Sequence, residues 1–193
     1  MSDHRVKVRS TELLSDNWGT LTKYTYDFTR RDGLAETQTR EVYDRGNGAT
    51  VLPYDPVRGT VLLTRQFRLP AFVVDQDPML IEACAGLLDD NDAETTARKE
   101  TEEELGYRLG DIERVFDVFM SPGSVTERLA FFIATYNPSD RISDGGGHED
   151  EGEDIEVLEM TLDEAMAMIA RRQIVDAKTI MLLQHLKLKQ LFR

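Results

Sequence analysis

The first part of the chain alternates apolar and polar residues, which is typical of strands with one covered face. The alternation is clearest at residues 22–28, inside a β-rich region that spans 5–45. A hairpin-like turn at 31–33 leads into a second run at 35–44. Two or three strands alone are marginally stable in water, so this sheet needs another surface, either the rest of the chain or a second copy.

After a boundary turn at 45–48 the pattern changes to short apolar runs and helical periods. Thr161 and Glu164 form a capping box that opens one amphipathic helix. The predicted strands are 49–54, 59–67, 79–84, 112–120, 129–136 and 155–160. The predicted helices are 93–105, 162–170 and 177–191. On the last helix the predicted apolar face consists of Ala177, Ile180, Leu183, Leu188 and Leu191. We therefore expect an α/β (α+β) protein with a β region at 1–45 and a main domain at 46–193.

The predicted helix at 93–105 is unusually rich in acidic residues. Glu100, Glu103 and Glu104 stand at i, i+3 and i+4, so their carboxylates project together, while Glu102 points away. The adjacent stripe is mostly apolar and should dock on a core: Ala97, Thr101 and Leu105. Like charges at this spacing repel, and a divalent cation such as Mg²⁺ would remove the repulsion. The competing interpretation is a solvated acidic helix face.

Composition limits the class of function. A net charge of −13 argues against a nucleic-acid surface, which would need a basic stripe. The single cysteine, Cys84, has apolar neighbours that suggest burial, and it fits a reducing cytoplasm. The N-terminus lacks the apolar run of a signal peptide, and no stretch approaches the ~20 apolar residues of a membrane span. We therefore expect a cytoplasmic protein without nucleic-acid or membrane partners.

Three further stretches are candidates for binding. Arg65 and Arg68 offer planar guanidinium groups suited to phosphate oxygens, although they could equally be surface arginines. The turn-rich loop 121–127 should sit near the acidic helix if it follows a central strand. The loop 138–154 combines three glycines with an acidic tail; it is either a disordered surface loop or a lid that brings one more carboxylate.

The acidic helix and the loop before it resemble the Nudix box. Its second half matches at 99–107, KETEEELGY, with Lys99 in place of arginine and Thr101 at an apolar position. The first half is one residue short, so Gly86 and Asp92 align only with a gap; an ungapped register would use Ala85 and Asn91 instead. The shortened box resembles the GDP-mannose pyrophosphatase branch of the Nudix hydrolase family, and the resemblance covers nearly the whole chain.

The resemblance implies a Nudix fold, an α/β/α sandwich around a mixed sheet, with an N-terminal antiparallel β extension that helps to build a homodimer. It implies Mg²⁺-dependent cleavage of GDP-mannose to GMP and mannose 1-phosphate, with Mn²⁺ as a possible substitute. ADP-ribose, cleaved to AMP and ribose 5-phosphate, is the alternative substrate. Two non-catalytic readings are a nucleotide-sugar sensor on the same fold and a purely structural acidic domain.

The resemblance also assigns residues. The implied metal ligands are the Ala85 carbonyl, Glu100, Glu104 and either Glu151 or Glu153. The catalytic candidates are Glu104, Glu103, Glu153 and Glu151. The implied substrate contacts are Trp18, Arg40, Glu41, Arg68, Gly86, Leu87, Glu127 and Lys178. Trp18, which would reach the substrate from the partner chain, could instead be a core residue at the sheet edge.

Overall fold

A computed structural model describes residues 5–88, 91–148, 150 and 152–191. The chain divides into two compact units. We call Met1–Asn47 with Val118–Arg128 the N-terminal unit, and Gly48–Asp117 with Leu129–Arg193 the main unit. Each is described by itself.

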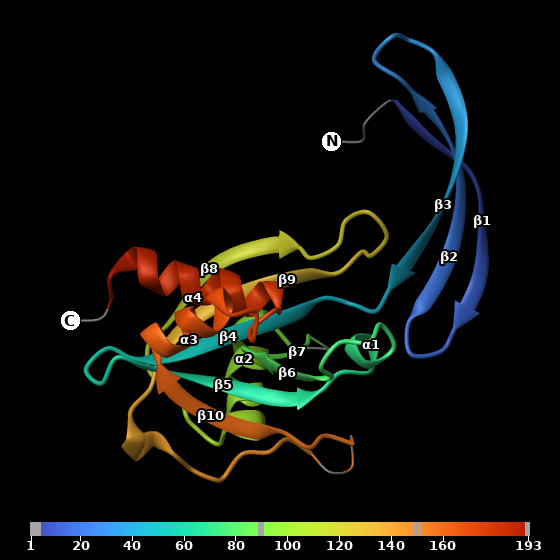
Figure 1. Ribbon diagram of the computed structural model, residues 1–193. Helices are drawn as coiled ribbons and strands as arrows, with labels where there is room; N and C mark the ends of the chain where they lie inside the picture. The colour runs from blue at the N-terminus through green and yellow to red at the C-terminus, as the bar shows by residue number, and fades with distance from the viewer. Residues whose placement is uncertain (1–4, 89–90, 149, 151, 192–193) are drawn as a thin grey trace. The chain divides into compact units, whose positions relative to one another are not determined.

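The N-terminal unit is built on a three-stranded antiparallel sheet in the order β1 (Val6–Asp16), β2 (Thr20–Thr29) and β3 (Ala35–Asp44) (Figure 1). The turn predicted between β2 and β3 is present, with Gly33 at a φ of 84°. In the described sequence of these three strands no residue is buried. This sheet therefore lacks a core of its own, as its small size predicts.

The loop predicted at 121–127 also belongs to the N-terminal unit. It is tied to the end of β3 by two backbone hydrogen bonds. The Tyr43 N–H donates to the Ser124 carbonyl at 2.8 Å, and the Thr126 N–H donates to the Tyr43 carbonyl at 3.0 Å. The backbone position of this loop is therefore set by β3.

The main unit contains a seven-stranded mixed sheet. Five strands run in the order β10 (Glu156–Thr161), β5 (Thr60–Phe67), β4 (Gly48–Asp55), β9 (Arg128–Thr135) and β8 (Ile112–Phe119). The run predicted as one strand at 79–84 is two, because β6 (Met79–Glu82) pairs with β5 and β7 (Cys84–Leu87) pairs with β4. The β4–β9 pair is parallel. Both strands are buried along nearly their whole length, which requires cover on both faces.

Helices supply that cover. α2 (Ala93–Glu100) packs against β7 and β4 and continues as a π-helical turn, η1 (Thr101–Leu105). α3 (Leu162–Ala170) and α4 (Ala177–Lys189) pack against each other and lie across the strands from α2 (Figure 1). Two short helices were not predicted: α1 (Leu69–Phe72) follows β5, and η2 (Pro138–Asp140) lies at the start of the loop predicted at 138–154. The predicted stripe of Ala97, Thr101 and Leu105 is fully buried.

The predicted apolar face of α4 is wrong. Leu188 is 83% exposed, and the buried residues of the helix are Lys178, Thr179, Leu182, Leu183 and Leu186. The buried face starts at a lysine because the Lys178 ammonium meets the Glu82 carboxylate inside the unit, at 3.1 Å. An apolar pattern alone could not reveal a face that is partly polar.

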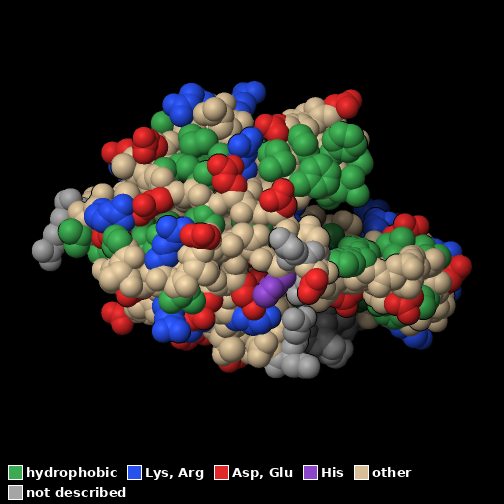
Figure 2. Space-filling model, turned by 90° about the horizontal axis from the view of Figure 1, so that it is seen from below, with side chains coloured by type: hydrophobic (Ala, Val, Ile, Leu, Met, Phe, Trp, Pro, Cys, Tyr) green, Lys and Arg blue, Asp and Glu red, His purple; other side chains and the backbone are tan. Residues whose placement is uncertain are grey.

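Two features of the described residues concern their charge distribution and the length of their helices. On the face shown in Figure 2, acidic and basic side chains are interspersed rather than gathered into a basic stripe. No helix within the described ranges has the length and apolar character needed to cross a membrane.

Candidate active site

Glu104 is the most unusual acid in the described part of the chain. The residue is 2% exposed, and its Oε2 atom is buried without a hydrogen-bond partner among the described residues. Burial raises the pKa of Glu104 to about 8, and the negative charges of Glu100 and Glu153 add to this increase. The Cys84 thiol donates a hydrogen bond to the Glu104 carboxylate and lowers its pKa, but this does not offset burial. Glu104 thus lies close enough to Glu100 and Glu153 to be repelled by both, and one of its two oxygens has no donor among the described residues.

Glu100 lies against the backbone of β7. A Cβ atom added to Gly86 would stand 2.1 Å from Glu100 Oε1, so glycine is required for the carboxylate to occupy this position. Ala85 and Gly86 are held in the antiparallel ladder with β4, opposite Thr50 and Ala49, and Leu87 pairs with Gly48. The strand β7 therefore presents a fixed stretch of backbone to the Glu100 carboxylate.

Glu103 has other partners. Its carboxylate lies 3.4 Å from Lys99 Nζ and 3.1 Å from His148 Nε2. Glu102 is exposed, as its place on the helix predicts, and lies 3.7 Å from Arg108 Nε. The structure therefore brings Glu104 together with Glu100 and Glu153, whereas the Glu103 carboxylate lies beside Lys99 and His148.

The glycine loop docks on the end of η1. The N–H groups of Gly146 and Gly147 donate to the carbonyls of Glu104 and Glu103, at 2.9 and 3.1 Å. A Cβ added to Gly145 would lie 2.5 Å from the Glu104 carbonyl, and the φ of Gly145 is 69°. These glycines permit a close approach of the loop backbone to the η1 backbone. The glycine content by itself indicates only conformational freedom of the loop.

Glu153 follows this loop. Its Oε2 atom accepts a hydrogen bond from the His148 N–H at 2.9 Å. His148 thus contacts two acids of the site, through its backbone and through its ring. The alternative loop ligand, Glu151, lies outside the described residues.

Arg68 and Lys178, both predicted as substrate contacts, meet on a residue that the sequence reasoning missed. Glu82 is 3% exposed. Its Oε2 atom lies 2.6 Å from Arg68 Nη2 and 3.1 Å from Lys178 Nζ. Its place as the one charged residue in the apolar run 79–86 was the available signal, because buried charges are paired. Arg65, in contrast, pairs with Glu156 across β5 and β10 at 3.4 Å.

The remaining predicted contacts belong to the N-terminal unit. Trp18 is 82% exposed and therefore is no core residue of this chain, and Arg40 and Glu41 are exposed on β3. Glu127 is largely buried and lies 3.5 Å from Arg45 Nε.

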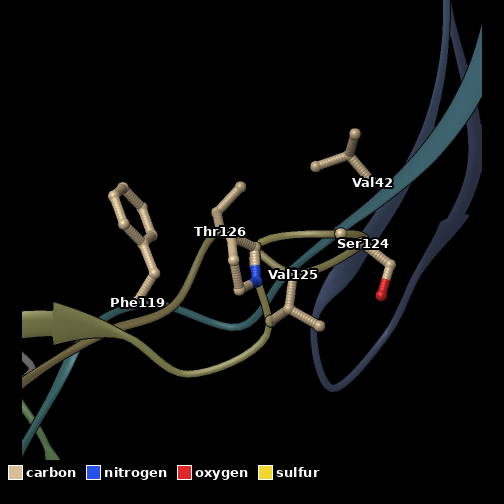
Figure 3. A pocket seen from close by; sticks show the side chains of 7 residues that line it. Val42, Phe119, Ser124, Val125 and Thr126 are labelled. Carbon is tan, nitrogen blue, oxygen red and sulfur yellow. The ribbon is translucent and has the colours of Figure 1, made fainter.

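The same unit holds a mostly apolar pocket of about 280 Å³, shown in Figure 3. Its lining is Val42, Phe119, Pro122, Gly123, Ser124, Val125 and Thr126.

Two protein-family models match this chain. The family model described as the NUDIX domain matches residues 44–183, and the model described as the GDP-mannose pyrophosphatase NudK N-terminal domain matches residues 5–43. The chain belongs to the Nudix family. The match confirms the family expected from the acidic helix.

The similarity to curated relatives covers most of the chain. This chain is 54% identical to a GDP-mannose pyrophosphatase of Pectobacterium atrosepticum, over 93% of each chain. It is 51% identical to a protein of the same name from Salmonella typhimurium, over 93% of this chain and 94% of the relative. A crystal structure titled ADP compounds hydrolase superposes with a TM-score of 0.72 over 98% of each chain, at 17% identity. The expected mixed α+β Nudix fold is thereby confirmed.

Nudix hydrolases generally use divalent metal ions, and the residues here fit one. The described ranges contain no group of three His, Cys, Asp or Glu side chains gathered closely enough to hold a metal by themselves. Mg²⁺, however, is commonly held by one or two carboxylates together with waters and substrate phosphates. The unpartnered Glu104 Oε2 and the Glu100 carboxylate against β7 supply such a donor set.

Proposed function

We propose that this protein is a Mg²⁺-dependent Nudix pyrophosphatase that hydrolyses GDP-mannose to GMP and mannose 1-phosphate. The observation that carries the proposal is the buried, unpartnered carboxylate oxygen of Glu104 beside Glu100 and Glu153. A cation is the simplest group that would stabilise three neighbouring carboxylates in their charged forms. Relatives named GDP-mannose pyrophosphatase, at 50–54% identity, support the choice of substrate.

In this proposal Glu100, Glu104 and the Ala85 carbonyl hold the metal, with Glu153 as the further ligand or base from the loop. A divalent metal held there would supply positive charge that shields the substrate phosphates and makes an attacking water more acidic. Glu153 takes the proton of the attacking water as the P–O bond to the leaving phosphate breaks. Glu103, Glu104 and Glu151 are the other candidate bases. Mn²⁺ is expected to substitute for Mg²⁺.

The residues around this centre bind the substrate. Arg68 and Lys178 are cations of the main unit, and the Arg68 charge lies close enough to Glu104 to affect its pKa. Gly86 and Leu87 offer backbone groups of β7 beside Glu100. Glu127 and the exposed residues Trp18, Arg40 and Glu41 are assigned to the nucleoside and sugar.

We also propose a homodimer built through the N-terminal sheet, residues 1–45, with residues 46–193 as the catalytic domain. The absence of any buried residue in the described β1, β2 and β3 supports this, because such a sheet is marginal without cover. The exposed Trp18 would then serve the partner's site. The buried thiol of Cys84 suits the cytoplasmic location that composition suggests.

The deciding experiment compares turnover of GDP-mannose and ADP-ribose by the purified protein with Mg²⁺, reading products by chromatography. We expect preference for GDP-mannose, release of GMP, and loss of turnover in EDTA. Preference for ADP-ribose would support the pyrophosphatase activity but contradict GDP-mannose as the substrate. Binding of GDP-mannose without cleavage of either compound would contradict the enzymatic activity and favour a sensor.

A further inference from the structure

Glu82 joins two cations that would otherwise be separate. Arg68 Nε lies 3.2 Å from both carboxylate oxygens of Glu82, and Arg68 Nη2 lies 2.6 Å from Oε2. Lys178 Nζ lies 3.1 Å from the same Oε2 atom. Because both cationic groups contact one oxygen, Glu82 holds them side by side.

Each cation keeps part of its donor capacity. Arg68 uses Nε and Nη2 on Glu82, and among the described residues its Nη1 group has no protein partner; the Arg68 side chain is 40% exposed. Lys178 has three N–H donors, of which one donates to Glu82 and a second can face Asp176, its ion-pair partner. This leaves one donor without a partner in the described ranges.

The position of Lys178 is fixed from the helix side as well. Asp176 caps α4 by accepting from the Thr179 N–H and hydroxyl, while its other oxygen lies 3.1 Å from Lys178 Nζ. The Ala83 N–H, next to Glu82, donates to the Thr179 hydroxyl at 2.7 Å. Glu82, the last residue of β6, is therefore joined to the start of α4 through Lys178, and Ala83 is joined to it through Thr179.

We infer that Glu82 is a positioning residue that holds Arg68 and Lys178 together as one two-cation clamp for the adjacent phosphates of a nucleoside diphosphate. The inference rests on the proposed function and concerns how the substrate-binding cations are held in place before the substrate binds. Two cations fixed at one point match two neighbouring phosphates better than two independent side chains, because less conformational freedom is lost on binding. The clamp is close to the acidic centre, since the Arg68 charge acts on Glu104.

The test is Glu82→Asp, which keeps the charge but withdraws the carboxylate by one methylene. The matched control is Glu159→Asp, the same change in a carboxylate that bonds Arg58 and Tyr136. We expect both variants to lower the melting temperature. Only Glu82→Asp should raise KM for GDP-mannose about tenfold with a smaller change in kcat, and weaken GDP binding about tenfold while changing GMP binding less.

Binding of GDP and GMP, measured by calorimetry in Mg²⁺, separates the inference from the proposed function. If wild type does not cleave GDP-mannose, the proposed function fails, and the change in GDP affinity still decides the role of Glu82. Unchanged KM and GDP affinity in Glu82→Asp, or no GDP binding by wild type, would overturn the clamp.

A second pair of variants covers the case in which Glu82→Asp does not fold. Lys178→Met and Glu82→Gln/Lys178→Met are compared, because the double change removes opposite charges together. We expect the double variant to have a KM about tenfold above that of Lys178→Met, since Arg68 is no longer oriented. Equal KM values would overturn the inference.

Discussion

Among single residues, Glu104 is the one in which burial most opposes the proposed role. Burial favours the neutral acid, whereas a metal ligand must be a charged carboxylate. Glu104→Gln removes one charge from the acidic centre with little steric change. We expect kcat to fall on the order of 100-fold or more, about 2.7 kcal/mol of transition-state stabilisation, with the fold intact by circular dichroism.

The control for this variant is Glu102→Gln, because Glu102 is exposed on the same π-helical turn and pairs with Arg108. Its kinetics should match wild type within a factor of about two, since an exposed ion pair contributes little. Wild-type-like turnover by Glu104→Gln would disprove the metal assignment, and an equal loss in both variants would disprove the assigned roles on this turn.

Glu82 predicts a pH dependence of stability. Burial alone would raise its pKa, but the hydrogen bonds of Arg68 and the charge of Lys178 lower it below the ordinary glutamate value. A lowered pKa in the folded state contributes stability above the unfolded pKa, near 4.3, that is lost as pH falls through the folded value.

Glu82→Gln should therefore lower the free energy of unfolding by about 3 kcal/mol at pH 7, because it removes the buried negative charge that pairs with both Arg68 and Lys178. Urea unfolding of both proteins between pH 7 and pH 3 measures this. The difference should shrink below about pH 4, and a difference that stays constant with pH would contradict the assignment.

At the scale of elements, the contact between the glycine loop and η1 depends on backbone conformation. Gly145→Ala would put a side chain at a φ of 69° and 2.5 Å from the Glu104 carbonyl. We expect a loss of about 1–3 kcal/mol in the free energy of unfolding. Gly123→Ala is the matched control, since Gly123 has no neighbour within 4 Å and no positive φ, and it should change stability by less than about 1 kcal/mol. Equal effects on thermal unfolding would show that the loop does not dock on η1.

The elements also show what a sequence can and cannot predict. The alternation at 22–28 and the capping box at Thr161 are local patterns, and β2 and α3 follow from them. The Nudix box located Glu100 and Glu104, because its spacing reflects one helix face. The split between β6 and β7 depends on pairing with two different strands, which the apolar run 79–84 does not encode.

Long-range polar pairs were missed for the same reason. Glu82 stands alone in an apolar run, which indicates a buried and paired charge, but Lys178 is far away in sequence and no local pattern identifies it as the partner. The buried face of α4 was assigned from apolar positions, so it omitted Lys178 and Thr179. The pairing of Glu103 with His148 likewise depends on how the glycine loop docks.

For the whole molecule, the N-terminal sheet makes a prediction about assembly. Leu13 is 59% exposed on β1 and stands opposite Thr22, on the face of the alternating run 22–28. Packing this face against a second copy of the chain would bury apolar surface and stabilise a sheet that otherwise has no core. Wild type should therefore sediment at twice the chain mass of 22.0 kDa, and Leu13→Glu should shift it toward the single-chain mass.

Ser10→Glu is the control, because Ser10 stands opposite Thr25 and so belongs to the other face of the sheet. It should leave the mass unchanged if that face stays in solvent. If Trp18 serves the partner's site, Leu13→Glu should also raise KM for GDP-mannose at protein concentrations where it is monomeric, whereas Glu104→Gln should lose kcat and remain dimeric. A wild-type protein that sediments as a single chain yet turns over normally would remove the dimer, and with it the contribution of the partner's Trp18, from the proposal.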